Sequence, residues 1–107
     1  MRKVIKLPNF NLEKKVALMV FIQGKELNST EVKVLSELIQ YSDNGILTIS
    51  SIINKNIAAT LKLNIGHLIT TTKRLVDKGI IEKDGKLITF PPLYQGLNEM
   101  TEVLVKS

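Results

Sequence analysis

The chain has 107 residues, of which 44% are hydrophobic and none is cysteine. This length supports one domain with a single modest core, and the lack of cysteine excludes disulfide frameworks, thiolate metal sites and cysteine nucleophiles. The formal net charge of +5 suits a polyanionic partner, because each phosphate that Lys or Arg neutralises releases condensed counterions.

The beginning of the chain lacks the pattern of a secretion signal. A secretion signal needs a continuous apolar stretch near its start, and here the charges at Arg2, Lys3 and Lys6 and the proline at Pro8 prevent one. The longest uninterrupted apolar run, at 16–22, is far shorter than the ~20 residues that a membrane-spanning helix needs. We therefore expect a soluble, cytoplasmic protein that does not bind membranes.

The first 24 residues are predicted to contain one short strand and one helix. Residues 4–7 form the strand, which Pro8 stops. Asn11 can cap a helix over 12–23 that ends at Gly24. A buried strand is an alternative there, because the second half of the segment is uniformly apolar.

A stronger helix signal begins at Asn28. Glu31 follows three positions later, the spacing of a capping box in which each side chain accepts a hydrogen bond from the other residue's backbone amide. The helix is predicted to reach about Tyr41. Its buried face would consist of Val32, Leu35, Leu38 and Ile39, with Lys33, Glu37 and Gln40 toward water. A turn at 42–45 then leads to a β-type run at 46–49, predicted to be the third strand of a small sheet.

Two helices around a tight turn are predicted next. Either serine at 50–51 can cap the first helix, and residues 62–64 form the turn. Asn64 can cap the second helix, which is predicted over 65–78 because its apolar residues recur at helical spacing. Gly79 stands where a helix end needs left-handed geometry. The core-facing residues of the first helix would be Ile53, Ile57, Ala58 and Leu61.

A β-hairpin is predicted to follow directly. The β-type runs at 80–83 and 86–90 are joined by Asp84-Gly85, a dipeptide that favours a two-residue type I′ turn. The proline pair at 91–92 then ends the sheet.

The C-terminal segment has two interpretations. Leu97, Met100 and Leu104 have helical spacing and suggest a short helix, whereas residues 101–105 could form a strand. Together with the run 16–22, these apolar residues exceed the evident needs of a small core. The two ends of the chain, 1–27 and 91–107, are therefore candidate dimerisation elements.

The second helix of the pair offers a surface to a polyanion. If Leu68, Thr72, Leu75 and Val76 pack inward, a rotation of about 100° per residue turns another set outward. That outward set is Gly66, His67, Ile69, Thr70, Lys73 and Arg74. A helix placed after such a turn usually contacts base edges with its N-terminal residues, so His67 and Thr70 are the expected base contacts.

Other residues would contact the DNA backbone. Lys73 and Arg74 are expected to bind phosphate or guanine, and Gly66 leaves room for phosphate at the helix start. The full candidate DNA-binding set is Asn64, Gly66, His67, Thr70, Lys73 and Arg74, with Lys55, Lys62, Lys83 and Lys86 as contacts that position the protein without reading sequence.

Several of these residues also have a purely structural interpretation. His67 could be a solvated helix residue, Gly66 could have no binding role, and the threonines at 70–72 could return their hydroxyls to backbone carbonyls. Ile69 could touch a thymine methyl or join a protein interface. Arg74 could pair with Asp77, and Lys55, Lys83 and Lys86 could serve solubility alone.

Catalysis is not expected. The acidic residues Asp43, Asp77, Glu82 and Asp84 are scattered over turns and helix ends, no basic residue accompanies a credible serine nucleophile, and no Gly-rich phosphate loop is present. His67 is the single histidine and a poor candidate metal ligand. We predict a protein that is not an enzyme and needs no cofactor or metal.

The pattern Ile57-Ala58-Ala59-x-Leu61-x-Leu63, followed by Leu68 and by KRLVDKGII at 73–81, resembles the winged helix-turn-helix superfamily, including multiple-antibiotic-resistance-type regulators. The short strand and serine pair at 46–51 are also similar to RepL-type plasmid replication initiators and to small phage-encoded winged-helix proteins. The resemblance covers residues 28–90. It implies binding of double-stranded DNA by the helix at 65–78.

The expected fold is mainly α with a small antiparallel sheet (α+β), a single winged helix-turn-helix domain over 1–107 with its core at 28–90. The expected function is binding of double-stranded DNA, as a transcriptional regulator or replication accessory factor and as a candidate homodimer, in the cytoplasm or in the host cytoplasm for a phage protein. The alternative is a winged-helix module that binds a protein partner, favoured by the outward Ile69 and the weakly basic recognition face.

Overall fold

The computed structural model describes residues 2–6, 11–94 and 102–106. In this part of the chain the helices are α1 (Leu12–Ile22), α2 (Ser29–Tyr41), α3 (Ser51–Leu61) and α4 (Ile65–Asp77), with a short 3-10 helix, η1 (Pro92–Tyr94). The strands are β1 (Arg2–Lys6), β2 (Ile46–Thr48), β3 (Glu82–Asp84), β4 (Leu87–Thr89) and β5 (Glu102–Lys106). The prediction of a mainly helical chain with a small antiparallel sheet is confirmed.

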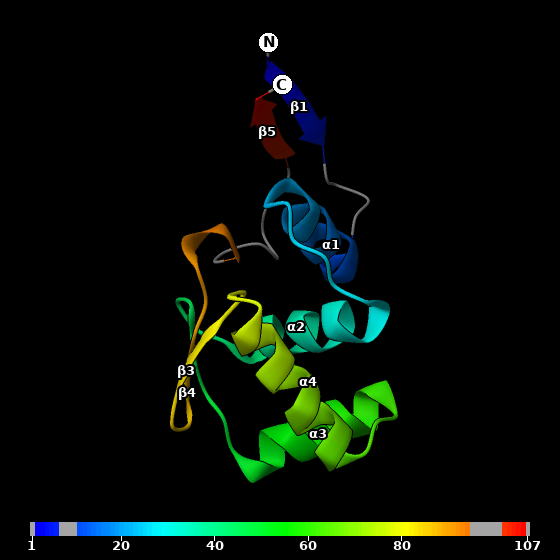
Figure 1. Ribbon diagram of the computed structural model, residues 1–107, viewed down its shortest axis with the longest axis vertical. Helices are drawn as coiled ribbons and strands as arrows, with labels where there is room; N and C mark the ends of the chain where they lie inside the picture. Colours follow the sequence, from blue (N-terminus) through cyan, green and yellow to red (C-terminus); the bar gives the residue numbers. More distant parts are fainter. Residues whose placement is uncertain (1, 7–10, 95–101, 107) are drawn as a thin grey trace.

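The elements stack along the longest axis of the molecule (Figure 1). Helix α2 crosses the centre, with α1 and the paired chain ends on one side of it and α4 and α3 on the other. The β3–β4 hairpin lies beside α2 and α4. Among the described residues, none of the helices reaches the length and apolarity needed to cross a membrane.

Helix α1 confirms the helical interpretation of this apolar segment over the strand alternative. The Asn11 side chain accepts a hydrogen bond from the Lys14 amide at 2.9 Å, and Gly24 follows the helix with φ +71°. Its buried apolar residues are Leu12, Val16, Met19 and Val20, which share one helical face. The sequence does not reveal this spacing, because every residue of the run 16–22 is apolar, so that buried and exposed positions look alike.

The expectation that the run 16–22 exceeds the needs of the core is wrong for most of its large residues. Val16, Met19 and Val20 are buried within the chain itself, where α1 packs against α2 and η1. The Tyr94 hydroxyl of η1 donates to Gln23 Oε1 at 2.6 Å. Only Phe21, which is 79% exposed, and Ile22 remain as large exposed apolar residues of this run.

Helix α2 begins with the predicted capping box. The Glu31 amide donates to Asn28 Oδ1 at 2.8 Å, and the Asn28 amide donates to Glu31 Oε1 at 3.0 Å. The predicted inward residues Val32, Leu35, Leu38 and Ile39 are all buried, and Lys33 and Gln40 are exposed while Glu37 is half-buried. The helix therefore forms the central wall of the core.

The three-stranded sheet has the order β2-β4-β3, so the predicted third strand is confirmed. A tight turn precedes β2, with Asn44 and Gly45 both at positive φ between the bridged residues Asp43 and Ile46. Two consecutive left-handed residues are typical of a type I′ turn. Leu47 and Ile88 face each other across β2 and β4 and are both buried, so one face of the sheet covers the core.

The hairpin forms as predicted, but its turn lies one residue later than expected. Asp84 pairs with Leu87, so the two turn residues are Gly85 and Lys86 rather than Asp84 and Gly85. Only Gly85 has positive φ, at +60°, which is the pattern of a type II′ turn. A type I′ turn at the predicted position would have required Asp84 to be left-handed, whereas this turn places its left-handed residue at glycine alone.

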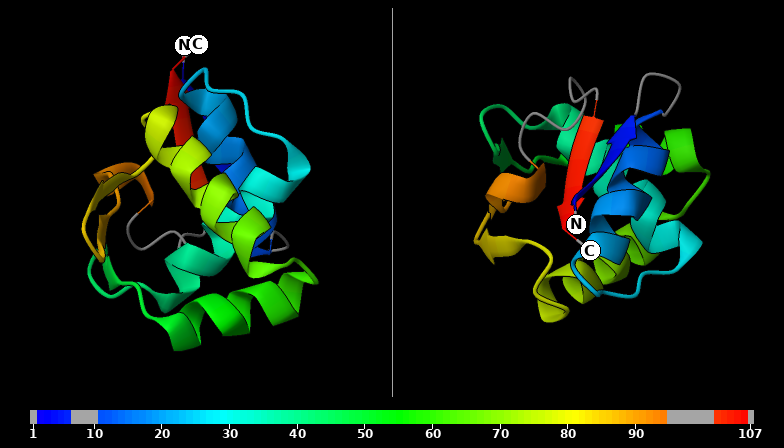
Figure 2. Two further views of the ribbon diagram at one scale, coloured as in Figure 1. Left: turned by 60° about the horizontal axis from the view of Figure 1, so that its bottom comes forward. Right: turned by 90° about the horizontal axis from the view of Figure 1, so that it is seen from above.

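The chain ends pair with each other as β1 and β5 (Figure 2). The antiparallel register runs from Arg2 opposite Lys106 to Lys6 opposite Glu102. The prediction of a strand near the N-terminus is thus confirmed with shifted bounds. At the C-terminus the strand interpretation is confirmed and the helix interpretation is wrong at Leu104; Leu97, Met100 and Thr101 lie outside the described residues.

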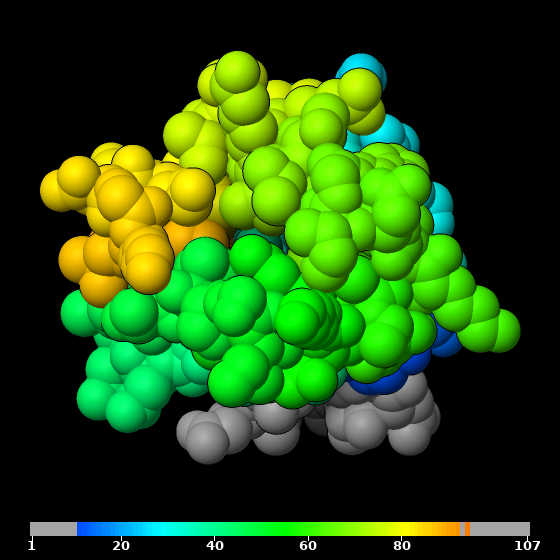
Figure 3. All heavy atoms as spheres, turned by 90° about the horizontal axis from the view of Figure 1, so that it is seen from below, coloured from blue at the N-terminus to red at the C-terminus, as the bar shows by residue number. Residues whose placement is uncertain are grey.

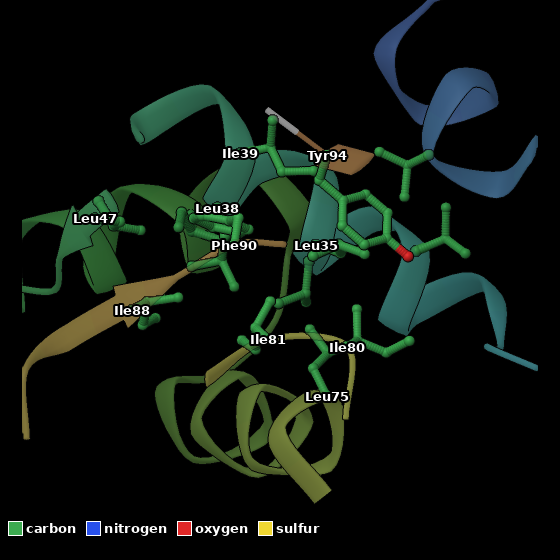
Figure 4. Packing of buried hydrophobic residues seen from close by; sticks show 14 of the residues in the cluster. Leu35, Leu38, Ile39, Leu47, Leu75, Ile80, Ile81, Ile88, Phe90 and Tyr94 are labelled. Carbon is green, nitrogen blue, oxygen red and sulfur yellow. The ribbon is translucent and has the colours of Figure 1, made fainter. Parts of the chain in front are cut away.

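The core lies between α2, α4 and the inner face of the sheet (Figure 4). In this view Leu35, Leu38 and Ile39 of α2 face side chains from α4, from the segment between α4 and the hairpin, from β4 and the residues after it, and from η1. The residues meeting them are Leu75, Ile80, Ile81, Ile88, Phe90 and Tyr94, all buried. Helix α4 is therefore held by its inner face against the centre of the domain.

Candidate nucleic-acid interface

Helices α3 and α4 are joined by the predicted turn of three residues. Ser50 caps α3, since its hydroxyl accepts from the Ile53 amide at 3.2 Å. Lys62 ends α3 in the left-handed conformation, with φ 57°. The Asn64 side chain then accepts from the His67 amide at 2.6 Å and starts α4. The chain reverses tightly because each helix end has its own capping residue.

The inner face of α4 consists of the predicted residues and one more, Thr71, which was not predicted to lie there. The predicted residues Leu68, Thr72 and Leu75 are buried, and Val76 is half-buried against the core. Thr71 is buried as well. The hydroxyls of Thr71 and Thr72 donate to the carbonyl oxygens of His67 and Leu68, at 2.8 and 3.0 Å. The structural interpretation of the threonine run is confirmed for these two residues.

The outer face of α4 is open. Every residue predicted to turn outward is exposed, namely Gly66, His67, Ile69, Thr70, Lys73 and Arg74. Arg74 makes no ion pair within the described part of the chain, so the predicted alternative of pairing with Asp77 is not observed. The helix ends at Asp77, one residue earlier than predicted.

Of the two candidate residues at the start of α4, Asn64 has a structural role as the helix cap, whereas the contacts of Gly66 do not require glycine. Asn64 is exposed, but its side-chain oxygen is engaged by the cap, which leaves its amide nitrogen as the group that could reach a partner. A Cβ on Gly66 would meet only Asn64 Oδ1, at 3.5 Å, which is an ordinary contact. No contact with the described residues therefore requires glycine at this position.

The remaining candidates lie on elements that share a face with α4. Figure 3 shows α3, α4 and the hairpin forming one continuous surface at this end of the molecule. Lys55 lies on α3, Lys62 in the turn, Lys83 on β3 and Lys86 in the hairpin turn, and all four are exposed. We call the surface of α3, the 62–64 turn, α4 and the hairpin the α3–α4–hairpin face.

Most of the net charge of the protein lies in the segment that builds this face. Residues 51–90 contain seven Lys or Arg and three Asp or Glu, a net charge of +4 out of the total of +5, and of these basic residues Lys78 is paired with Glu31 of α2. The rest of the chain is nearly neutral. A concentration of charge on one surface attracts a polyanion more strongly than the same charge spread evenly.

A hollow of about 470 Å³ separates α4 from the hairpin. Its walls include Ile69, Lys73 and Asp77 of α4, Asn54 of α3 and Lys83 of β3. The outer face of α4 is thus bordered by a depression with mixed apolar and charged walls.

The C-terminal end of α4 is anchored to α2 by an ion pair. Lys78 Nζ donates to Glu31 Oε1 at 2.9 Å and to the Glu26 carbonyl oxygen at 3.2 Å. Burial raises the pKa of Glu31, but the hydrogen bonds from Asn28 and Lys78 and the charges of Lys78 and Arg74 outweigh it and hold the pKa below its usual value of 4.5. The capping role of Glu31 is evident from its spacing to Asn28, but no local pattern predicts its contact with Lys78, 47 positions away.

No protein family matches the chain, and searches of curated proteins and of solved structures find no match either. Within residues 2–6, 11–94 and 102–106, no three His, Cys, Asp or Glu side chains gather in a way that could hold a metal ion.

Proposed function

We propose that this chain is a winged helix-turn-helix protein that binds double-stranded DNA, as a regulator of transcription or an accessory factor of replication. The order of elements supports the fold assignment: α2, β2, α3 and α4 are followed by the β3–β4 hairpin, and the sheet order is β2-β4-β3. In this assignment α4 is the recognition helix and the hairpin is the wing.

The observation that carries the proposal is the open, basic outer face of α4. The inner face of this helix is committed to the core, while His67, Thr70, Lys73 and Arg74 are all exposed on the other side. The major groove of B-DNA is about 12 Å wide and admits one α-helix. A helix that is buried on one side and cationic on the other suits this groove and its phosphate walls.

Each part of the α3–α4–hairpin face has a proposed role in the complex. The first turns of α4 approach base edges through His67 and Thr70, and Lys73 and Arg74 bind phosphate or guanine. Lys55, Lys62, Lys83 and Lys86 contact the DNA backbone and fix the orientation of the protein without reading sequence. The proposal requires no cofactor.

A homodimer would double the few base contacts that one recognition helix can make. Phe21, which is 79% exposed at the end of α1, is the most exposed large apolar residue of the predicted dimerisation segments among the residues whose exposure the structure describes, and it is available for such a contact. We propose this assembly as the form that binds a two-fold symmetric site.

The second candidate function is binding of a protein partner through the same face. The exposure of Ile69 on α4 and of Ile52 on α3 favours it, because exposed apolar side chains can mark protein interfaces. The basic side chains around them favour DNA. Salt dependence separates the two, since a largely apolar protein interface does not release condensed counterions.

A titration of mixed-sequence duplex DNA at several salt concentrations tests the proposal. If the six basic residues of the candidate set contact phosphates, the slope of log Kobs against log salt should be about −5, and affinity should fall roughly 1,000-fold between about 50 and about 200 mM salt. Fluorescence anisotropy of a labelled duplex measures both quantities. Undetectable duplex binding at the lower salt concentration would contradict the proposal.

A further inference from the structure

Two isoleucines interrupt the polar outer face of α4. Ile69 is 54% exposed, and Ile65, one turn earlier, is 38% exposed. A large apolar side chain left partly in water forgoes part of the favourable free energy that its burial would contribute. Neither belongs to the buried inner face of the helix, which consists of Leu68, Thr71, Thr72 and Leu75.

The same face has few groups that read bases through hydrogen bonds. Helix α4 contains no Asn or Gln, and its one Arg, Arg74, lies in the last turn. The side chains best suited to paired hydrogen bonds with adenine or guanine are therefore scarce where the helix would enter the groove. Any sequence preference must rest largely on other contacts.

Ile65 and Ile69 are four positions apart, so they lie next to each other on the helix surface, and polar side chains flank them. His67 and Thr70 are exposed beside Ile65 and Ile69, and Lys73 lies one turn beyond Ile69, beside the hollow between α4 and the hairpin. A protein partner generally covers a larger apolar patch than these two partly exposed isoleucines provide. A pair of apolar side chains within a cationic surface instead fits methyl groups on a polyanion.

We propose, on the basis of the DNA-binding function proposed above, that Ile69, assisted by Ile65, recognises the C5 methyl groups of thymine in the major groove. Thymine is the base that presents an apolar group there, and apolar side chains contact it favourably. The positive charge of the α3–α4–hairpin face attracts the duplex to α4. The two isoleucines then give the protein a preference for sites rich in A·T pairs.

Duplexes that differ only in this methyl group test the inference. One contains alternating adenine and thymine, and the other replaces every thymine by uracil, which lacks the methyl but keeps the same hydrogen-bonding edges. At one fixed salt concentration the thymine duplex should bind about fourfold more tightly for each methyl buried, since burial of one such group contributes about 0.8 kcal/mol. Replacement of cytosine by 5-methylcytosine in a G·C duplex should tighten binding by a similar factor.

Two alanine variants assign the effect to α4. Ile69→Ala should reduce the ratio of the two affinities toward one, and alanine is a good helix former at an exposed position. Ile22→Ala is the matched control, because Ile22 is 38% exposed at the end of α1, outside the α3–α4–hairpin face, and this variant should keep the full ratio.

The outcomes separate this inference from the proposal on which it rests. Equal binding of the thymine and uracil duplexes by the wild-type protein, or an unchanged ratio in Ile69→Ala, overturns thymine recognition while DNA binding stands. Failure to bind either duplex at low salt overturns DNA binding itself. A protein that binds both duplexes and prefers thymine only while Ile69 is present supports both.

Discussion

Replacing both Lys73 and Arg74 by alanine is expected to weaken binding to mixed-sequence duplex DNA about 30-fold, from roughly 1 kcal/mol for each lost charge–phosphate contact. Both side chains are exposed, and neither forms an ion pair within the described part of the chain. Their removal therefore costs the free protein little. The slope of log Kobs against log salt should become less steep by about two units, close to 0.9 for each phosphate released.

The control for this variant removes the same charge elsewhere. Lys14 on α1 and Lys33 on α2 are exposed and lie outside the α3–α4–hairpin face, so their double replacement by alanine changes the net charge equally. Anisotropy titrations of both proteins should show a large loss for the α4 variant and a small one for the control. Equal losses would mean that only overall charge matters and that α4 is not at the interface.

Replacing Glu31 by glutamine is expected to lower the free energy of unfolding by about 2 kcal/mol at neutral pH, the scale of a hydrogen-bonded charge contact that is lost. The Glu31 side chain is only 2% exposed and joins the start of α2 to Lys78 at the end of α4. Glutamine keeps an oxygen for the Asn28 amide but not the charge. The second oxygen, Oε2, is buried and has no hydrogen-bond partner among the described residues, so an amide nitrogen placed there would also lack one.

The contribution of Glu31 should depend on pH in one direction. Its pKa lies below the usual value of 4.5 in the folded protein, so the unfolded chain takes up the proton first as pH falls. The carboxylate therefore makes its full contribution to the free energy of unfolding above pH 4.5. This contribution is lost as the pH falls through the pKa of Glu31 in the folded protein. The difference between wild type and Glu31→Gln should therefore shrink on acidification below 4.5.

Urea denaturation across this pH range measures that difference. Glu13→Gln is the matched control, because Glu13 also lies in the first turn of a helix but is exposed, and its replacement should change stability little at any pH. A difference for Glu31→Gln that stays constant with pH would show that the ion pair with Lys78 is not its source.

The features that could be predicted from the sequence are those encoded over a few residues. Asn28 and Glu31 determine the start of α2, and Asn64 determines the start of α4, because a capping side chain acts on amides within three positions. The outward set of α4 followed from the spacing of its apolar residues. The exposure of all candidate contacts on this helix agrees with that reasoning.

The features that could not be predicted depend on contacts between distant segments. The ion pair of Lys78 with Glu31 and the pairing of β1 with β5 each join residues that no local pattern relates. Burial of Thr71 depends on how closely α4 approaches its neighbours, and its hydroxyl is satisfied by a carbonyl of its own helix. The hairpin turn was displaced because Gly85 alone supplies the left-handed geometry that the turn requires.

The central claim is that the outer face of α4 meets DNA, and backbone amide chemical-shift mapping during addition of mixed-sequence duplex DNA tests it most directly. The claim predicts the largest shifts in residues 65–74 and in the hairpin around Lys83 and Lys86, with little change in α1. Shifts confined to α1 and the paired chain ends, with the amides of α4 unchanged, would contradict it.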